Sequence, residues 1–276
     1  YLAEPLAMAS ASPGKCGLLR LLFECDSRAV SVLRSLERRA PLIVQQPLYF
    51  DEALPTMPCV YILSSGGPIV DGDRYEQIFS LRGGAMVHLS TGAATKLAEM
   101  RYNYSSMRQT IRLEPESYLE YLPEPIIPCR HTRYASDTLI TIAPSATMIY
   151  AEIYLSGRRF FGSGERFQYD VLSVALQAER EDGSPLFREK FLIRPEMHSP
   201  EGIGAMGGWD IFANVILLTP EAVADDIYAA TDVFFDPRRK LAAGITRLPA
   251  NCGVQYKIIG NDSGTIKRMV REFASR

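Results

Sequence analysis

Short apolar runs broken by turn residues recur along almost the whole chain, and this spacing constrains the fold more than any other sequence feature. From Leu18 to Val87 the runs include GLLRLLFE, APLIVQQPLYF and CVYILSSGG, and a second series extends from RQTIRLEP to WDIFANVILLTP. Runs rich in β-branched and aromatic residues between Gly, Pro, Asp and Ser are typical of strands. Their spacing of about ten to fifteen residues favours one continuous sheet system over βαβ units. We predict a mainly β protein.

Four segments depart from this simple pattern. Residues 26–40 (DSRAVSVLRSLERRA) contain helix-forming Leu and Arg, but AVSVL alternates as a half-buried strand does, so we predict a strand. Residues 90–106 fit one or two helical turns or an irregular strand equally well. Residues 219–235 and 262–276 predict helices, the first with a Thr cap and the second with an Asp or Ser cap.

Composition limits the classes of partner and compartment. Acidic and basic residues nearly cancel to a net charge of −2, so the broad positive field that holds nucleic acid is absent. No apolar run approaches the roughly 18 residues that cross a bilayer, and the start lacks the features of a signal peptide. The five cysteines form no CxxC pair, which favours reduced, mostly buried thiols. We expect a cytoplasmic protein that binds neither nucleic acid nor membrane.

The domain organisation predicted from the sequence is simple. Apolar residues are 47% and charged residues 22% of the chain, which is enough material for one large core. No long Pro/Gly linker and no internal repeat divides it. We predict a single domain over residues 1–276, with about 1–14 as a poorly ordered N-terminal extension.

Four spaced motifs resemble those of the urease accessory protein UreD/UreH family. The segment SSGGPIVDGDRYEQIFSLRGGAMVHLSTGAATK is similar to the family's GG-x-x-x-GD turn followed by a strand and a small-residue run. SYLEYLPEP, with Glu120 and Pro123, and GRRFFGSGE resemble two further segments, and ITRLPANCGVQYKIIG resembles the closing one. Lys257 stands where an Arg is more usual in the family.

The resemblance implies both fold and function. The implied fold is an extended β-helical or helicoid arrangement of many strands with about two helices, the clearest near the C-terminus. The implied function is urease maturation. A non-catalytic scaffold binds urease apoprotein together with UreF and, through UreF, the GTPase UreG, as a dimer of UreD–UreF heterodimers. Nickel then passes through an internal tunnel to the urease dinickel site, with Ni²⁺ as transient cargo and no tightly bound cofactor.

Four residues are candidates for the nickel path. The matched motifs move Asp73 and Glu165 toward this role, although Asp-Gly-Asp is also an ordinary turn and Glu165 fits a surface pair with an Arg. Thr95 could bind the hydration shell of a cation. Glu152 lies in an otherwise apolar strand, where a buried carboxylate costs several kcal/mol unless it is paired, solvated or metal-bound.

The remaining candidates have structural or weaker metal roles. The matched residues with a structural or partner-binding role are Gly66, Gly67, Gly72, Lys96 and Arg158. Cys129 and His131 are the one loose pair with soft-ligand character for a weak metal site, although a buried thiol beside a hydrogen-bonded imidazole is the commoner arrangement.

Two further sequence features bear on function. The proline-rich residues 122–129 predict an edge or corner crossing that could contact a partner, and the apolar stripe of residues 262–276 fits either a partner or the chain's own sheet.

No GxSxG, HExxH or P-loop motif points to catalysis. Carboxylates spread over strands also fit a carbohydrate-active β-helix enzyme, which is the alternative function.

Overall fold

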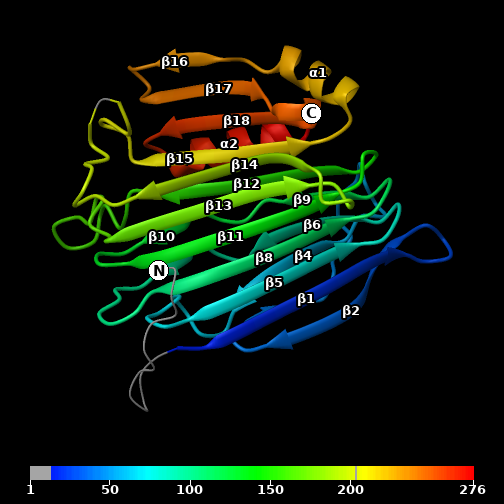
Figure 1. The fold of residues 1–276 in the computed structure, drawn as a ribbon, viewed down its shortest axis with the longest axis horizontal. Helices are drawn as coiled ribbons and strands as arrows, with labels where there is room; N and C mark the ends of the chain where they lie inside the picture. The colour runs from blue at the N-terminus through cyan, green and yellow to red at the C-terminus, as the bar shows by residue number, and fades with distance from the viewer. Residues whose placement is uncertain (1–13, 203) are drawn as a thin grey trace.

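The computed structural model describes residues 14–276 apart from residue 203, and these residues form two stacked β-sheets with two helices (Figure 1). The predicted extension at 1–14 lies outside the described residues except for Gly14. Sheet A has the strand order β14 (Pro185–Ile193), β13 (Val171–Glu179), β11 (Arg133–Ile142), β8 (Ser105–Leu113), β5 (Arg74–Leu81), β1 (Cys16–Cys25) and β2 (Ser31–Arg39).

Sheet B is the larger of the two sheets and carries both helices. Its order is β16 (Phe234–Asp236), β17 (Leu241–Arg247), β18 (Gly253–Gly260), β15 (Ile211–Leu218), β12 (Thr147–Leu155), β9 (Tyr118–Tyr121), β6 (Met86–Thr91), β4 (Cys59–Ser64) and β3 (Leu42–Val44), with short β7 (Thr95–Leu97) and β10 (Ile126–Pro128) off this path. The helices are α1 (Glu221–Ala230) and α2 (Ser263–Ala274), and a 3-10 turn covers Pro249–Asn251.

The chain alternates between the two sheets along its middle part. From β4 to β13, strands β4, β6, β9 and β12 of sheet B alternate with strands β5, β8, β11 and β13 of sheet A. The short β7 and β10 follow β6 and β9 and pair with each other, and β10 also pairs with β12. Neighbouring strands of β5, β8, β11 and β13 are therefore parallel, as are those of β4, β6, β9 and β12. Parallel neighbours need a crossover, which a strand of the other sheet provides here. The fold is mainly β and β-helical, as predicted, although its strands form two sheets rather than one.

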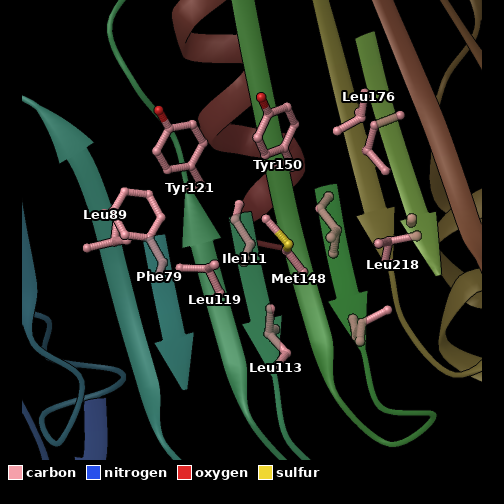
Figure 2. Close-up of a cluster of buried hydrophobic side chains, with 14 of the residues drawn as sticks. Phe79, Leu89, Ile111, Leu113, Leu119, Tyr121, Met148, Tyr150, Leu176 and Leu218 are labelled. Carbon is pink, nitrogen blue, oxygen red and sulfur yellow. The ribbon is translucent and has the colours of Figure 1, made fainter. Parts of the chain in front are cut away.

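Two separate cores lie on the two faces of sheet B. The inner core fills the space between the sheets, where side chains of both sheets meet (Figure 2). The outer core lies between sheet B and the helices, and α2 contributes Ile266, Val270 and Phe273 to it. The apolar stripe of the C-terminal helix thus packs on the chain's own sheet.

Most segment predictions agree with the structure, and two are wrong in detail. Residues 26–40 contain strand β2, and residues 90–106 contain strand β7 rather than a helical turn. The predicted Thr cap of α1 is absent, because Thr219 Oγ1 lies 2.9 Å from Thr147 Oγ1 and the N-cap is Pro220. Helix α1 also ends at Ala230, before β16, whereas residues 219–235 were expected to be helical throughout.

Helix α2 and the cysteines follow the sequence predictions. The carboxylate of Asp262 caps α2 by accepting a hydrogen bond from the backbone N–H of Thr265 at 2.7 Å. All five cysteines are free thiols, and Cys59, Cys129 and Cys252 are buried. Among the residues described, neither helix has the length and apolar character needed to span a membrane.

Candidate functional site

A row of buried polar side chains crosses sheet A on its inner face. Gln77 of β5, Gln109 of β8 and Thr138 of β11 are direct partners in the parallel register, so they point to the same side. Gln109 Nε2 donates to Gln77 Oε1 at 2.8 Å, and Thr138 Oγ1 lies 3.5 Å from Gln109 Oε1. All three side chains are buried. Hydrogen bonds within the row offset the cost of removing these groups from water.

The row continues across the inner core to sheet B. Thr138 Oγ1 is 3.2 Å from the hydroxyl of Tyr150 on β12, which points into the space between the sheets (Figure 2). The hydroxyls of Tyr150 and Tyr154 both donate to Glu152 Oε1, at 2.9 and 3.0 Å. We call these six residues the inner polar lane: Gln77, Gln109, Thr138, Tyr150, Glu152 and Tyr154.

Glu152 is the chemically distinctive residue of the lane. Its side chain is buried, and Oε2 has no hydrogen-bond partner among the residues that the structure describes. Burial raises the pKa of Glu152 from 4.5 to about 7, against the lowering effect of the two tyrosine hydroxyls, and the charge of Glu189 adds to the rise. The carboxyl therefore changes protonation state near neutral pH, and one oxygen is free to bind a proton or a cation.

Asp73, predicted from its motif, is a buried carboxylate whose two oxygens are both occupied. Oδ1 accepts from the backbone N–H of Lys15 at 2.8 Å, and Oδ2 accepts from that of Val70 and from the hydroxyl of Tyr75. Gly72, directly before it, has φ +85°. The segment forms the predicted turn, in which Gly72 supplies the left-handed conformation and Asp73 binds neighbouring groups.

Glu165 and Arg158 form a two-bond ion pair. Arg158 Nε donates to Glu165 Oε2 at 2.7 Å and its Nη2 donates to Oε1, while the backbone N–H of Arg130 reaches Oε2 at 3.2 Å. The Arg158 guanidinium lowers the pKa of Glu165. Gly157 has φ +143°, and a Cβ atom there would lie 1.9 Å from the carbonyl oxygen of Glu165. The GR-x-x-x-x-x-GE spacing thus closes a tight loop on a buried carboxylate.

The other predicted residues lie away from the inner polar lane. Thr95 and Lys96 are on β7, half-buried and exposed respectively, and Thr95 pairs in register with Ile126. Gly66 and Gly67 follow β4 in a turn, with Gly67 at φ +71°. Of the predicted nickel-path residues, only Glu152 belongs to the lane.

Cys129 and His131 lie in the turn after β10. Cys129 is buried, whereas the side chain of His131 is 55% exposed and its Nδ1 is 3.1 Å from Asp170 Oδ1. Within the described part of the chain, no group of three or more His, Cys, Asp and Glu side chains is arranged to hold a metal ion. A weak, two-ligand role for this pair stays a prediction.

Sequence reasoning missed the polar row of sheet A. The signal was present in RYEQIFSL, because Tyr75, Gln77 and Phe79 alternate onto one face and Gln77 is polar among buried neighbours. Gln109 occupies the same place in β8, between Met107 and Ile111. Alternation shows that each residue faces inward, but only the register between strands shows that they meet.

The fold and the lane define a class of protein: a β-helical body of two sheets with a polar row through its core. The chain belongs to the family described as UreD urease accessory protein, which it matches over residues 15–276. The resemblance seen in the sequence motifs is therefore confirmed, and membership supports a role in urease maturation.

Relatives of nearly the same length share this description. The chain is 43% identical over 272 residues to the urease accessory protein UreD 2 of Brucella canis, covering 99% of this chain and 90% of the relative. It is 43% identical over 274 residues to the UreD 2 protein of Brucella abortus strain 2308, with the same coverage of both chains. It is 41% identical over 273 residues to the UreD protein of Yersinia pseudotuberculosis serotype O:1b, covering 99% of this chain and 85% of the relative.

Proposed function

We propose that this chain is a cytoplasmic urease maturation scaffold that binds urease apoprotein together with UreF and, through UreF, the GTPase UreG, and conducts nickel to the urease dinickel site. The assembly is a dimer of heterodimers with UreF. Family membership supports the role in maturation. The relatives are named accessory proteins, so the carbohydrate-active enzyme is not retained as a proposal.

The buried carboxyl group of Glu152 is the observation that supports the nickel path. A carboxylate oxygen is a hard ligand that holds Ni²⁺ weakly and releases it, as a conduit requires. Its Oε1 accepts from the hydroxyls of the inner polar lane, whereas its Oε2 is buried and has no hydrogen-bond partner in the described part of the chain. A structural role alone leaves the cost of burying this oxygen without compensation.

Movement of an ion along this lane requires rearrangement of aromatic side chains. Tyr154 stacks on Phe212 at 5.1 Å between ring centroids, and Phe191 meets both rings edge-on at 5.3 Å. Tyr154 is fully buried in the inner core, and Phe191 and Phe212 are partly buried against it. We infer that these rings swing aside when the chain is bound to its partners, which restricts passage to the assembled complex.

Exposed aromatic residues support a partner-binding role. Phe160 is 92% exposed and Tyr102 is 77% exposed. Large exposed aromatic side chains are the residues that contribute most to binding energy when a partner covers them. The guanidinium of Arg158, already held by Glu165, lies 3.8 Å from the ring centroid of the neighbouring Phe161.

The proposal is tested by complementing a urease operon that lacks its own copy of this chain. Wild-type protein should restore urea hydrolysis and nickel content. Glu152→Leu should lower nickel per urease strongly while UreF and apoprotein still co-purify, since the lane loses its only acidic group. Lys267→Met, on the outer helix, is the matched control and should behave as wild type. Full nickel loading by Glu152→Leu would contradict a nickel path through the lane.

A further inference from the structure

A surface groove opens where the two sheets part. Sheet B extends beyond the last strand of sheet A, so the inner face of β15, β18 and β17 is uncovered beside the edge strand β14 (Figure 1). The groove has a volume of about 770 Å³ and is lined by residues that include Glu189, Phe191, Met206, Phe212, Asn214 and Lys257. We call it the β14 groove.

Glu189 joins the two sheets at the inner end of this groove. It belongs to β14 of sheet A, yet its three partners belong to sheet B. Asn214 Nδ2 and Gln255 Nε2 each donate to Glu189 Oε2 at 2.7 Å, and Lys257 Nζ donates to Oε1. The Glu189 side chain is 21% exposed and that of Lys257 is 58% exposed. One oxygen is fixed by amides, and the other is neutralised by a solvent-accessible ammonium.

The Glu189 cluster is next to Glu152 of the inner polar lane. Glu152, Asn214 and Lys257 are direct partners on β12, β15 and β18, so they form one row on the inner face of sheet B. The charge of Glu189 also adds to the rise that burial causes in the pKa of Glu152. Asn214 thus lies between Glu189, to which it donates, and Glu152, whose buried Oε2 has no hydrogen-bond partner among the described residues.

We propose that Glu189 is the outer carboxylate of the nickel lane and that Lys257 is its displaceable counter-charge. This inference rests on the proposed function. A divalent cation in the β14 groove replaces the ammonium of Lys257 on Glu189 and passes to Glu152 when the Tyr154, Phe191 and Phe212 rings move. No covalent bond forms or breaks in this exchange.

The charges of the cluster make the exchange feasible. A half-exposed Lys–Glu pair contributes little free energy, because water screens it and the long side chain loses freedom. A divalent cation carries twice the charge of the ammonium and is attracted more strongly to the same oxygen. Asn214 and Gln255 keep Glu189 in place while Lys257 leaves, so the carboxylate does not have to be rebuilt after each exchange.

The test measures urease activation in the complete complex of full-length chains over a range of Ni²⁺ concentrations. Glu189→Gln should raise the Ni²⁺ concentration for half-maximal activation about tenfold, since one charged ligand is lost. Lys257→Met should lower it several-fold, because the cation no longer competes with an ammonium. The double variant should behave like Glu189→Gln. Lys267→Met on α2, which breaks a similar ion pair with Glu124, is the control and should match wild type.

A purely structural ion pair gives a different pattern and would overturn the inference. In that case Glu189→Gln and Lys257→Met act in the same direction, and the double variant is no worse than either. If Glu189→Gln does not fold, Lys257→Met alone tests the inference. Loss of a structural bond should not lower the Ni²⁺ concentration for half-maximal activation, whereas removal of a competing ammonium should. Melting temperature and co-purification of partners separate stability from transport.

Glu152→Gln separates this inference from the proposed function. If Glu152→Gln impairs nickel loading and Glu189→Gln does not, a nickel path through the inner polar lane is supported, but Glu189 is not its outer carboxylate. If both variants load nickel normally, the nickel path and the inference fail together. Impaired nickel loading in both Glu152→Gln and Glu189→Gln, together with a lower Ni²⁺ requirement in Lys257→Met, supports the nickel path and the role of Glu189 in it.

Discussion

The two faces of strand β12 have the same burial but different chemistry. On the outer face Ile149, Ala151 and Ile153 pack beneath the helices without any polar side chain among them. On the inner face Tyr150 and Glu152 alternate with these residues and are just as buried. Burial alone therefore does not explain the composition of the strand. The outer face is built for stability, whereas the inner face keeps a carboxyl group at a cost in free energy.

The largest expected effect is a loss of stability caused by a substitution in the outer core. Phe273 is 4% exposed and stacks on Tyr256 with ring centroids 5.0 Å apart. Phe273→Ala should lower the free energy of unfolding by about 3–5 kcal/mol through lost burial and a cavity, measured by chemical denaturation. Nickel loading per folded molecule should be unchanged. A loading defect in the folded fraction would show that the two faces are not independent.

On the inner face, Glu152 should make the free energy of unfolding change with pH in the direction opposite to that caused by an ordinary ion-paired acid. Because the pKa of Glu152 is about 7 in the folded protein and 4.5 ordinarily, the folded state binds more protons between these values. The free energy of unfolding should therefore fall by up to about 3 kcal/mol as pH rises from 4.5 to 7, and level off above. Glu152→Gln should remove this slope in denaturation curves recorded across that range.

Glu165 provides the matched control for this pH experiment. Arg158 lowers the pKa of Glu165, so the stability from that pair is present above its ordinary pKa and is lost as pH falls below it. Glu165→Gln should change the acid side of the profile and leave the slope between pH 5 and 7 intact. A Glu152→Gln profile parallel to wild type would mean that Glu152 is already ionised in the folded protein.

The smallest expected effect concerns the end of the helix that covers the outer face. Asp262→Ala removes the side-chain acceptor for the Thr265 N–H and should destabilise the protein by about 1 kcal/mol. Thermal denaturation checks this, with Ser263→Ala at the first helical position as the control. Nickel loading should be as in wild type, and equal stability of the two variants would contradict the capping role.

The sequence predicted individual strands well because strand signals are local. Alternation identified residues 26–40 as a strand, and the polar Glu152 was recognised within an apolar run. The resemblance to the family, confirmed above, supplied the β-helical arrangement. Asp73 was placed in its turn by the Gly72 that precedes it.

The parts that could not be predicted depend on register between distant strands. Nothing local to Glu189 shows that it bonds to Asn214 and Gln255 of the other sheet. The Thr219 cap failed for a related reason, since its hydroxyl is taken by Thr147, 72 residues away. The sequence also put Glu165 and Glu152 together among the nickel-path candidates, although Glu165 is paired with an arginine and Glu152 has an oxygen without a partner among the described residues.

The coiled path of the chain has a consequence for its biogenesis. The contact between Gln77 and Gln109 closes a loop of 32 residues, and the neighbouring parallel pairs in sheet A close loops of comparable length. The chain loses entropy when such loops close, before strand pairing contributes favourable free energy. Proteins of this topology therefore fold slowly. During that interval half-finished coils expose unsatisfied backbone edges, which favour association with other chains. We expect the yield of native protein to depend on synthesis rate and temperature more steeply than for a helical protein of equal size.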